Sequence, residues 1–144
     1  MMDEDLGSAI GGLIGGALEG RTDSTLVPVR VATSCREDSA AAIAEAIRDL
    51  VTAFHERNDC HASSVRVVLF TATADLRASK PASAARAAGW NAAQYLCLAE
   101  MPTDDDIARC IRGLLFVERH RAAAALQPVY RNGTHVLRPD IAMS

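Results

Sequence analysis

Residues 65–71 (VRVVLFT) set the tightest limit on the fold of this chain. The run contains four β-branched residues together with a leucine and a phenylalanine, a composition that is typical of a strand. It is too apolar to lie open to water on both faces. We therefore expect a central strand of a sheet, with the rest of the chain supplying its neighbours and its cover.

Four further strands are predicted. Residues 26–32 form a short β-branched run, and residues 94–99 also have the pattern of a strand. The Asn-Gly pair at 132–133 is the preferred pair for a tight hairpin turn. Residues 129–130 and 134–137 should therefore pair as antiparallel strands.

The first predicted helix follows a capping-box pattern formed by Ser34 and Glu37, a pair whose side chains satisfy backbone amides at a helix start. Apolar residues then recur at helical spacing over residues 43–54, and the helix should end near residues 57–59. We therefore expect one amphipathic helix between the first two strands.

Two more helices are predicted further along the chain. Pro81 suits the first turn of a short helix that runs to Ala88, where Gly89 should stop it. Residues 104–106 are aspartates that complement the positive end of a helix dipole, so a third helix should start at residue 103 or 104. Its apolar face would consist of Ile107, Cys110, Ile111, Leu114 and Leu115.

These elements follow the order β-α-β-α-β-α-β-β, which predicts one mixed α/β domain over residues 27–144. Residues 1–26 are rich in glycine and alanine, and so many glycines raise the entropic cost of any helix. We predict that residues 1–26 are a flexible N-terminal extension. An arm that binds a partner or packs an oligomer is the alternative.

Charge and cysteine content exclude several classes of function. The net charge of −3 offers no general attraction to nucleic acid or to an anionic membrane, so any anion-binding site has to be local. The four cysteines include no Cys-x-x-Cys pair, which argues against a metal site and against a disulfide framework. Reduced thiols fit a cytoplasmic protein. The acidic first residues lack the positive start of a secretory signal.

Three arginines lie at the edges of apolar elements. Arg30 is inside the first strand, Arg112 is in the third predicted helix, and Arg138 ends the last predicted strand. Guanidinium groups that are buried or half-buried need anionic partners. Taken one at a time, each arginine could pair with a structural carboxylate or reach solvent, and Glu100 could equally be a surface charge.

Short motifs and their spacing point to a family. The motifs are VRVAT (29–33), TATADL (71–76), GW (89–90), CLAEM (97–101), CIR (110–112) and VLRPD (136–140). Ten residues lead from Trp90 to Glu100, twelve from Glu100 to Arg112, and eight from Tyr130 to Arg138. In this order, over about residues 29–142, these features resemble the trimeric α/β-barrel class of bacterial chorismate mutases.

The resemblance implies an activity and a fold. The activity is the Claisen rearrangement of chorismate to prephenate in aromatic amino acid biosynthesis. The fold is a chorismate mutase-type mixed sheet with helices packed on it, assembled as a pseudo-barrel homotrimer with active sites at subunit interfaces.

The resemblance also implies a role for each matched residue. Arg112 would contact the ether oxygen and a carboxylate of chorismate, and Arg30 and Tyr130 would bind the carboxylates. Glu100 and Cys97 would hold the substrate hydroxyl. Further pocket residues would be Arg138, which helps to enclose the site, together with Leu137 and Tyr95.

Three positions depart from the family pattern and leave the substrate preference open. Lys80 stands where the family often has an aromatic residue, Ser83 stands where it often has a lysine, and Leu96 replaces a more polar residue next to Cys97. All three are candidate substrate-binding residues. They allow a related enzyme that acts on another chorismate-like carboxylate, and a non-catalytic binder of such ligands is the second alternative.

The chemistry of the rearrangement explains why a set of positively charged side chains can be enough for catalysis. Chorismate is a dianion, and its rearrangement breaks a carbon–oxygen bond and forms a carbon–carbon bond within one molecule, so we expect no cofactor and no metal. Fixed contacts to the carboxylates can gather the reacting ends, and a preorganised cation can stabilise charge on the departing oxygen. Cys97 near Glu100 also suggests covalent catalysis, but no neighbouring histidine in the sequence completes that arrangement.

Overall fold

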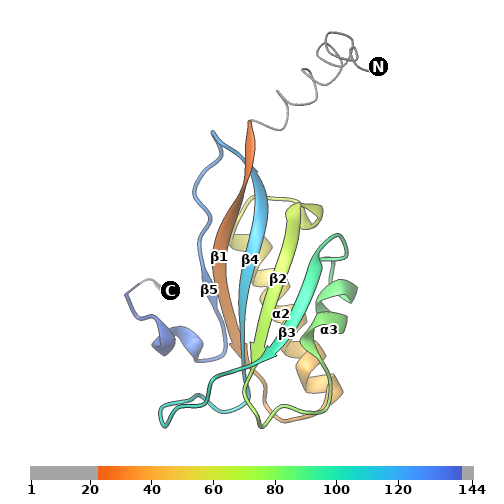
Figure 1. Ribbon diagram of the computed structural model, residues 1–144, viewed down its shortest axis with the longest axis vertical. Coiled ribbons are helices and arrows are strands. Elements are labelled where there is room, and N and C mark those ends of the chain that lie inside the picture. Colours follow the sequence, from red (N-terminus) through yellow and green to blue (C-terminus); the bar gives the residue numbers. More distant parts are fainter. Residues whose placement is uncertain (1–22, 141–144) are drawn as a thin grey trace.

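The computed structural model describes residues 23–140, which form a five-stranded mixed sheet and two α-helices (Figure 1). The predicted mixed fold of sheet and helices is therefore confirmed. Short 3₁₀ helices occur at Ala62–Ser64 and Thr134–Leu137. In chain order the main elements are β1 (Ser24–Ser34), α2 (Ala40–Arg57), β2 (Val65–Ala72), α3 (Pro81–Ala87), β3 (Gln94–Ala99), β4 (Cys110–His120) and β5 (Val129–Tyr130).

The strands lie side by side in the order β3-β2-β4-β1-β5. β4 is antiparallel to both of its neighbours, whereas β3 runs parallel to β2 and β5 runs parallel to β1. β1 and β4 pair along their whole length, from Ser24 opposite His120 to Ser34 opposite Cys110. β2 is an interior strand, as its apolar sequence predicts, but the middle position belongs to β4.

Both α-helices cover the same face of the sheet. In the view of Figure 1, α2 and α3 lie behind the strands, and neither helix covers the front. The buried stripe of α2 packs on the sheet because its apolar residues recur every three or four positions. The side chains of this core that are almost fully buried include Ile43, Ile47, Leu50, Phe54, Val68, Phe70, Trp90, Ile111 and Leu115.

Four predicted elements are found at or close to the places that the sequence predicted. β2 and β3 cover the predicted runs, with β2 one residue longer. α3 has Pro81 in its first turn and ends at Ala87, just before Gly89, whose φ of 131° few other residues adopt. β1 contains the predicted strand and extends it by two residues at each end.

The third predicted helix is wrong, because residues 110–120 form the strand β4. Burial alternates along β4: Ile111, Gly113 and Leu115 face the helices, and Arg112 and Leu114 lie on the other face. Ile111 and Leu115 fit a period of two as well as a helical period, so their spacing alone does not distinguish a strand from a helix. Residues 103–106 form a local turn instead, in which Asp106 accepts hydrogen bonds from the backbone N–H and the hydroxyl of Thr103.

Gly113 lies on the buried face of β4, where there is no room for a side chain. An added Cβ there would lie 2.8 Å from Cγ2 of Val31 and 3.2 Å from the Phe70 ring. Both neighbours are buried, at 2% and 0% exposure, so neither has room to move. A glycine inside this strand therefore permits the close approach of two neighbouring strands.

The predicted start of the first helix is also wrong. Ser34 is the last residue of β1, and its hydroxyl donates to the backbone oxygen of Asn132. The helix begins five residues later, with Ser39 as N-cap: its side-chain oxygen accepts a 3.1 Å hydrogen bond from the amide of Ala42. The predicted end of the helix is confirmed at Arg57.

The predicted hairpin near the C-terminus is wrong in its second strand. Asn132 and Gly133 do turn the chain, with φ values of 55° and 84°. Thr134 is then buried, and its hydroxyl bonds to the backbone oxygens of Ala32 and Arg131 at 3.2 and 2.8 Å. These bonds favour a 3₁₀ turn over an extended strand, and β5 pairs with β1 instead.

The predicted N-terminal extension, residues 1–26, lies outside the described residues except for its last four. Of these four, residues 24–26 belong to β1.

Candidate active site

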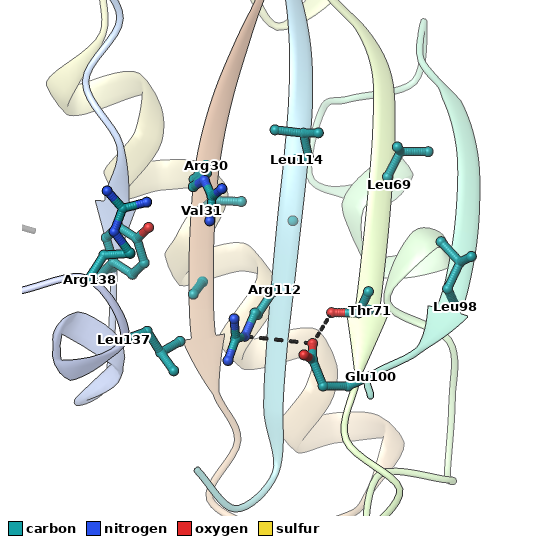
Figure 2. Close-up of a pocket in the computed structure, with 13 residues that line it drawn as sticks. Arg30, Val31, Leu69, Thr71, Leu98, Glu100, Arg112, Leu114, Leu137 and Arg138 are labelled. Atoms are coloured by element: carbon teal, nitrogen blue, oxygen red, sulfur yellow. Dashed lines mark hydrogen bonds and ion pairs between the residues drawn. The ribbon is translucent and has the colours of Figure 1, made fainter. Parts of the chain in front are cut away.

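A cavity of about 360 Å³ lies on the face of the sheet that the helices leave bare (Figure 2). Side chains from all five strands, from the residue after β3 and from the C-terminal 3₁₀ helix surround it. Its lining consists of Arg30, Val31, Ala32, Leu69, Thr71, Leu98, Glu100, Arg112, Gly113, Leu114, Tyr130, Leu137 and Arg138.

Strand register explains why these distant residues meet. One row of paired residues crosses the sheet from Tyr130 through Ala32, Arg112 and Thr71 to Leu98. The next row on the same face runs from Arg30 through Leu114 and Leu69 to Leu96. Because side chains two positions apart on a strand share a face, the two rows form one floor for the cavity.

Glu100 closes one side of the cavity and has two possible donors near the same oxygen. Its backbone N–H donates to Ala72 at 3.0 Å, which fixes the residue directly after β3. The hydroxyl of Thr71 donates to Oε1 of Glu100, and Nε of Arg112 lies 3.6 Å from that oxygen (Figure 2). The carboxylate side chain is 16% exposed, so it is well shielded from solvent.

Arg112 has an unused hydrogen-bond donor. At 3.6 Å, its Nε is too far from Glu100 for a hydrogen bond, and no other group within residues 23–140 accepts from this buried nitrogen. A buried donor without a partner costs about 1–3 kcal/mol. A ligand oxygen in the cavity would remove that cost.

Tyr130 lies among the three cavity arginines. Burial raises the pKa of its phenol, while the charges of Arg30, Arg138 and Arg112 act in the opposite direction. The phenol therefore stays protonated at neutral pH and can donate a hydrogen bond. The influence of all three guanidinium groups on one ring shows that they share one electrostatic environment.

Arg138 is held at the rim by a two-point ion pair. Its Nε and Nη2 donate to the two carboxylate oxygens of Asp140 at 3.0 and 2.8 Å. Hydrogen bonding to Arg138 lowers the pKa of Asp140. By contrast, no ion pair joins Arg30 to a carboxylate within residues 23–140.

The cavity therefore carries excess positive charge in a chain whose net charge is −3. Three guanidinium groups and a phenol donor face one carboxylate and an apolar floor. Such a site suits a small ligand with two carboxylates, an apolar ring and a polar group for Glu100.

Comparison with known proteins decides the family. Residues 26–141 match the family described as chorismate mutase type I. The chain belongs to the type I chorismate mutases.

Individual relatives agree with this assignment. Chorismate mutase AroH of Bacillus subtilis is 30% identical over 117 residues, which cover 81% of this chain and 92% of that protein. Chorismate mutase AroH of Thermus thermophilus is 32% identical over 114 residues, covering 78% and 93%. A solved chorismate mutase from Clostridium thermocellum superposes with a TM-score of 0.67 at 27% identity, covering 76% of this chain and 98% of that one.

The family assignment confirms the resemblance drawn from the sequence motifs and the prediction of an isomerase of the chorismate mutase type. No group of His, Cys, Asp and Glu side chains suited to a metal ion occurs in residues 23–140. No helix in that part of the chain has the length and apolar character to cross a bilayer.

The structure brings six of the predicted site residues of this chorismate mutase together in one cavity. They come from β1, the end of β3, β4, β5 and the C-terminal 3₁₀ helix, and Arg112 lies on a strand where a helix was predicted. The six are Arg30, Glu100, Arg112, Tyr130, Leu137 and Arg138.

Five other predicted site residues lie outside the cavity of the single chain. The hydroxyl of Tyr95 donates to the backbone oxygen of Trp90 at 2.6 Å, and its ring stacks on Phe70, on the helix-covered side. Leu96 is 62% exposed on the bare face. The remaining three are Cys97, which is exposed on β3, Lys80, which caps α3, and Ser83 within α3.

Seven cavity residues were not predicted as site residues: Val31, Ala32, Leu69, Thr71, Leu98, Gly113 and Leu114. Each is a strand residue whose place in the site depends on which strand pairs with which. The signal for them was the alternation on neighbouring strands, which becomes usable once residues 110–120 are recognised as a strand.

Proposed function

We propose that the cavity binds chorismate as a dianion and that its residues catalyse the rearrangement to prephenate. The observation that carries this assignment is the meeting of Arg30, Arg112, Arg138, Tyr130 and Glu100 around one cavity of about 360 Å³. This is a small-molecule volume, with positive charge on one side and leucines on the floor.

Arg112 stabilises the charge that develops on the departing ether oxygen. Its Nε is a buried donor with no acceptor among residues 23–140, and its place at the centre of the floor aims it at the middle of a bound ligand. The planar guanidinium can reach the ether oxygen and a carboxylate at once, which a lysine could not do. A preorganised donor of this kind contributes about 3–4 kcal/mol to the lowering of a barrier.

The two carboxylates of chorismate are bound by Arg30 and by the phenol of Tyr130, and Arg138 encloses the site. For Arg138 to do so, a substrate carboxylate has to compete with Asp140 for the same guanidinium. Glu100 holds the substrate hydroxyl, together with Cys97 supplied by a neighbouring subunit. Together these contacts gather the two reacting ends into a near-attack geometry, so no proton transfer or covalent intermediate is needed.

The working unit is a homotrimer with its sites at subunit interfaces. Support comes from the bare sheet face, which exposes Leu98 to 49% and Leu96 to 62% beside a cavity that one chain leaves open. A contiguous apolar surface next to a site suits a neighbouring subunit. Lys80 and Ser83 would then reach the cavity of the adjacent chain.

The enzyme works in the cytoplasm, where the unpaired thiols of its four cysteines stay reduced.

The direct test mixes purified protein with chorismate and follows the loss of the substrate's ultraviolet absorbance. We expect catalysed conversion to prephenate with no added metal or cofactor, at a rate per chain that falls on dilution as the trimer dissociates. Absence of conversion by assembled protein would refute the assignment. Conversion at full rate by a monomer would refute the interface site alone.

A further inference from the structure

Thr71 is a cavity residue for which neither the motifs nor the chemistry so far assigns a role. It lies on β2, between Arg112 on β4 and Leu98 on β3 in the strand register. Its hydroxyl donates to Oε1 of Glu100, the same oxygen that Nε of Arg112 faces at 3.6 Å (Figure 2). Two donors from neighbouring strands thus converge on one carboxylate oxygen.

The two contacts are unequal. The hydroxyl of Thr71 makes a hydrogen bond to Glu100, whereas the Arg112 contact exceeds hydrogen-bond distance and leaves Nε without an acceptor among residues 23–140. A carboxylate side chain that is 16% exposed should be drawn towards a neighbouring guanidinium, because a pair in which both groups are charged adds Coulomb attraction to the hydrogen bond. In this structure that closure does not take place, and the oxygen stays with Thr71.

We infer that Thr71 is a positioning residue for the reaction: its hydroxyl holds Glu100 away from Arg112, so that Arg112 Nε and the second carboxylate oxygen of Glu100 stay available to the substrate. This inference rests on the proposed function, in which both groups touch chorismate. The backbone bond from Glu100 to Ala72 fixes the base of the side chain, so the Thr71 hydroxyl sets only the direction of its carboxylate.

The test replaces Thr71 with valine, which keeps the shape and removes the donor, and with serine, which keeps the donor. In Thr71→Val, Glu100 should close on Arg112, and chorismate must then break that pair. We expect kcat/KM to fall by about 10-fold or more, since the lost bond involves a charged group. Thr71→Ser should recover most of the loss.

A double-variant comparison separates positioning from a general structural effect. In a Glu100→Gln background the neutral amide has no ion pair to form with Arg112, so adding Thr71→Val should change kcat/KM by less than about 3-fold. An equally large effect in both backgrounds would overturn the inference. Thr25→Val is the matched control, because Thr25 is an exposed residue at the far end of β1 and should leave kcat/KM unchanged.

A crystal structure of Thr71→Val gives a readout that does not depend on activity. The distance from Arg112 Nε to Glu100 Oε1 should shorten from 3.6 Å to hydrogen-bond range, about 2.7–3.2 Å. An unchanged distance together with unchanged kinetics would overturn the role of Thr71 and leave the proposed function intact. A wild-type protein that does not convert chorismate would overturn the proposed function, while the distance in the variant would still report on Thr71.

Discussion

Replacing Arg112 with citrulline should separate catalysis from folding most cleanly. Citrulline keeps the planar shape of arginine and removes the charge. The only ion pair of Arg112 within residues 23–140 is the 3.6 Å contact with Glu100, and its side chain is 42% exposed. Ion pairs this exposed contribute about 0–1 kcal/mol to stability, so the melting temperature should shift by only a few degrees.

The catalytic effect should be much larger. Citrulline retains the Nε–H group but loses the positive charge that faces the departing oxygen. Preorganised electrostatic stabilisation of this kind lowers the barrier by about 3–4 kcal/mol, so kcat should fall by about 100-fold to 1,000-fold. KM should change less, because Arg30, Tyr130 and Arg138 still bind the substrate. The assay is steady-state chorismate consumption, with circular dichroism melting on the same preparation. Turnover within tenfold of wild type would refute the assigned role of Arg112.

Three further outcomes are expected. Gly113→Ala should destabilise the fold by about 1–3 kcal/mol in denaturant titration, because the new Cβ meets buried Val31 and Phe70; an unchanged midpoint would contradict this. Burial lowers the pKa of His55, whose Nε2 accepts from Trp90 at 2.9 Å, so its contribution to stability is complete above its unfolded pKa of about 6.5 and is lost as pH falls below it. Fluorescence of Trp90 should therefore show a steeper acid loss of stability in wild type than in His55→Gln, and equal slopes would count against the idea. Cys97→Ser should keep substantial activity, since the role proposed for Cys97 is to position the substrate, and complete loss in a folded variant would reopen covalent catalysis.

Local patterns predicted β2, β3 and α3 because each is bounded by its own stop signals and has one plausible period. The same kind of reasoning gave the wrong prediction for β4. Ile111 and Leu115 fit the period of a strand as well as that of a helix, and the aspartates at 104–106 resemble a helix start. Only the neighbours Val31 and Phe70, which close over Gly113, require a strand there. Those contacts join residues far apart in the sequence, so local pattern could not supply them.

The site was predicted unevenly for a similar reason. The charged members, Arg30, Glu100 and Arg112, stand out because half-buried charge needs a partner and because their spacing matches a family. Thr71 and Leu98 are ordinary strand residues until the register places them beside Arg112. Polar chemistry could thus be predicted from composition and spacing, whereas the floor of the cavity required the topology.

The unbroken pairing of β1 with β4 has a consequence for the empty enzyme. Arg30 and Arg112 project from adjacent strands of that ladder, so in the absence of ligand the hydrogen-bonded ribbon holds two mutually repelling cations in place. Binding of a dianionic ligand would place negative charge between the two guanidinium groups, and both would then be attracted to the ligand. Occupancy should then slow amide exchange in the middle of the sheet.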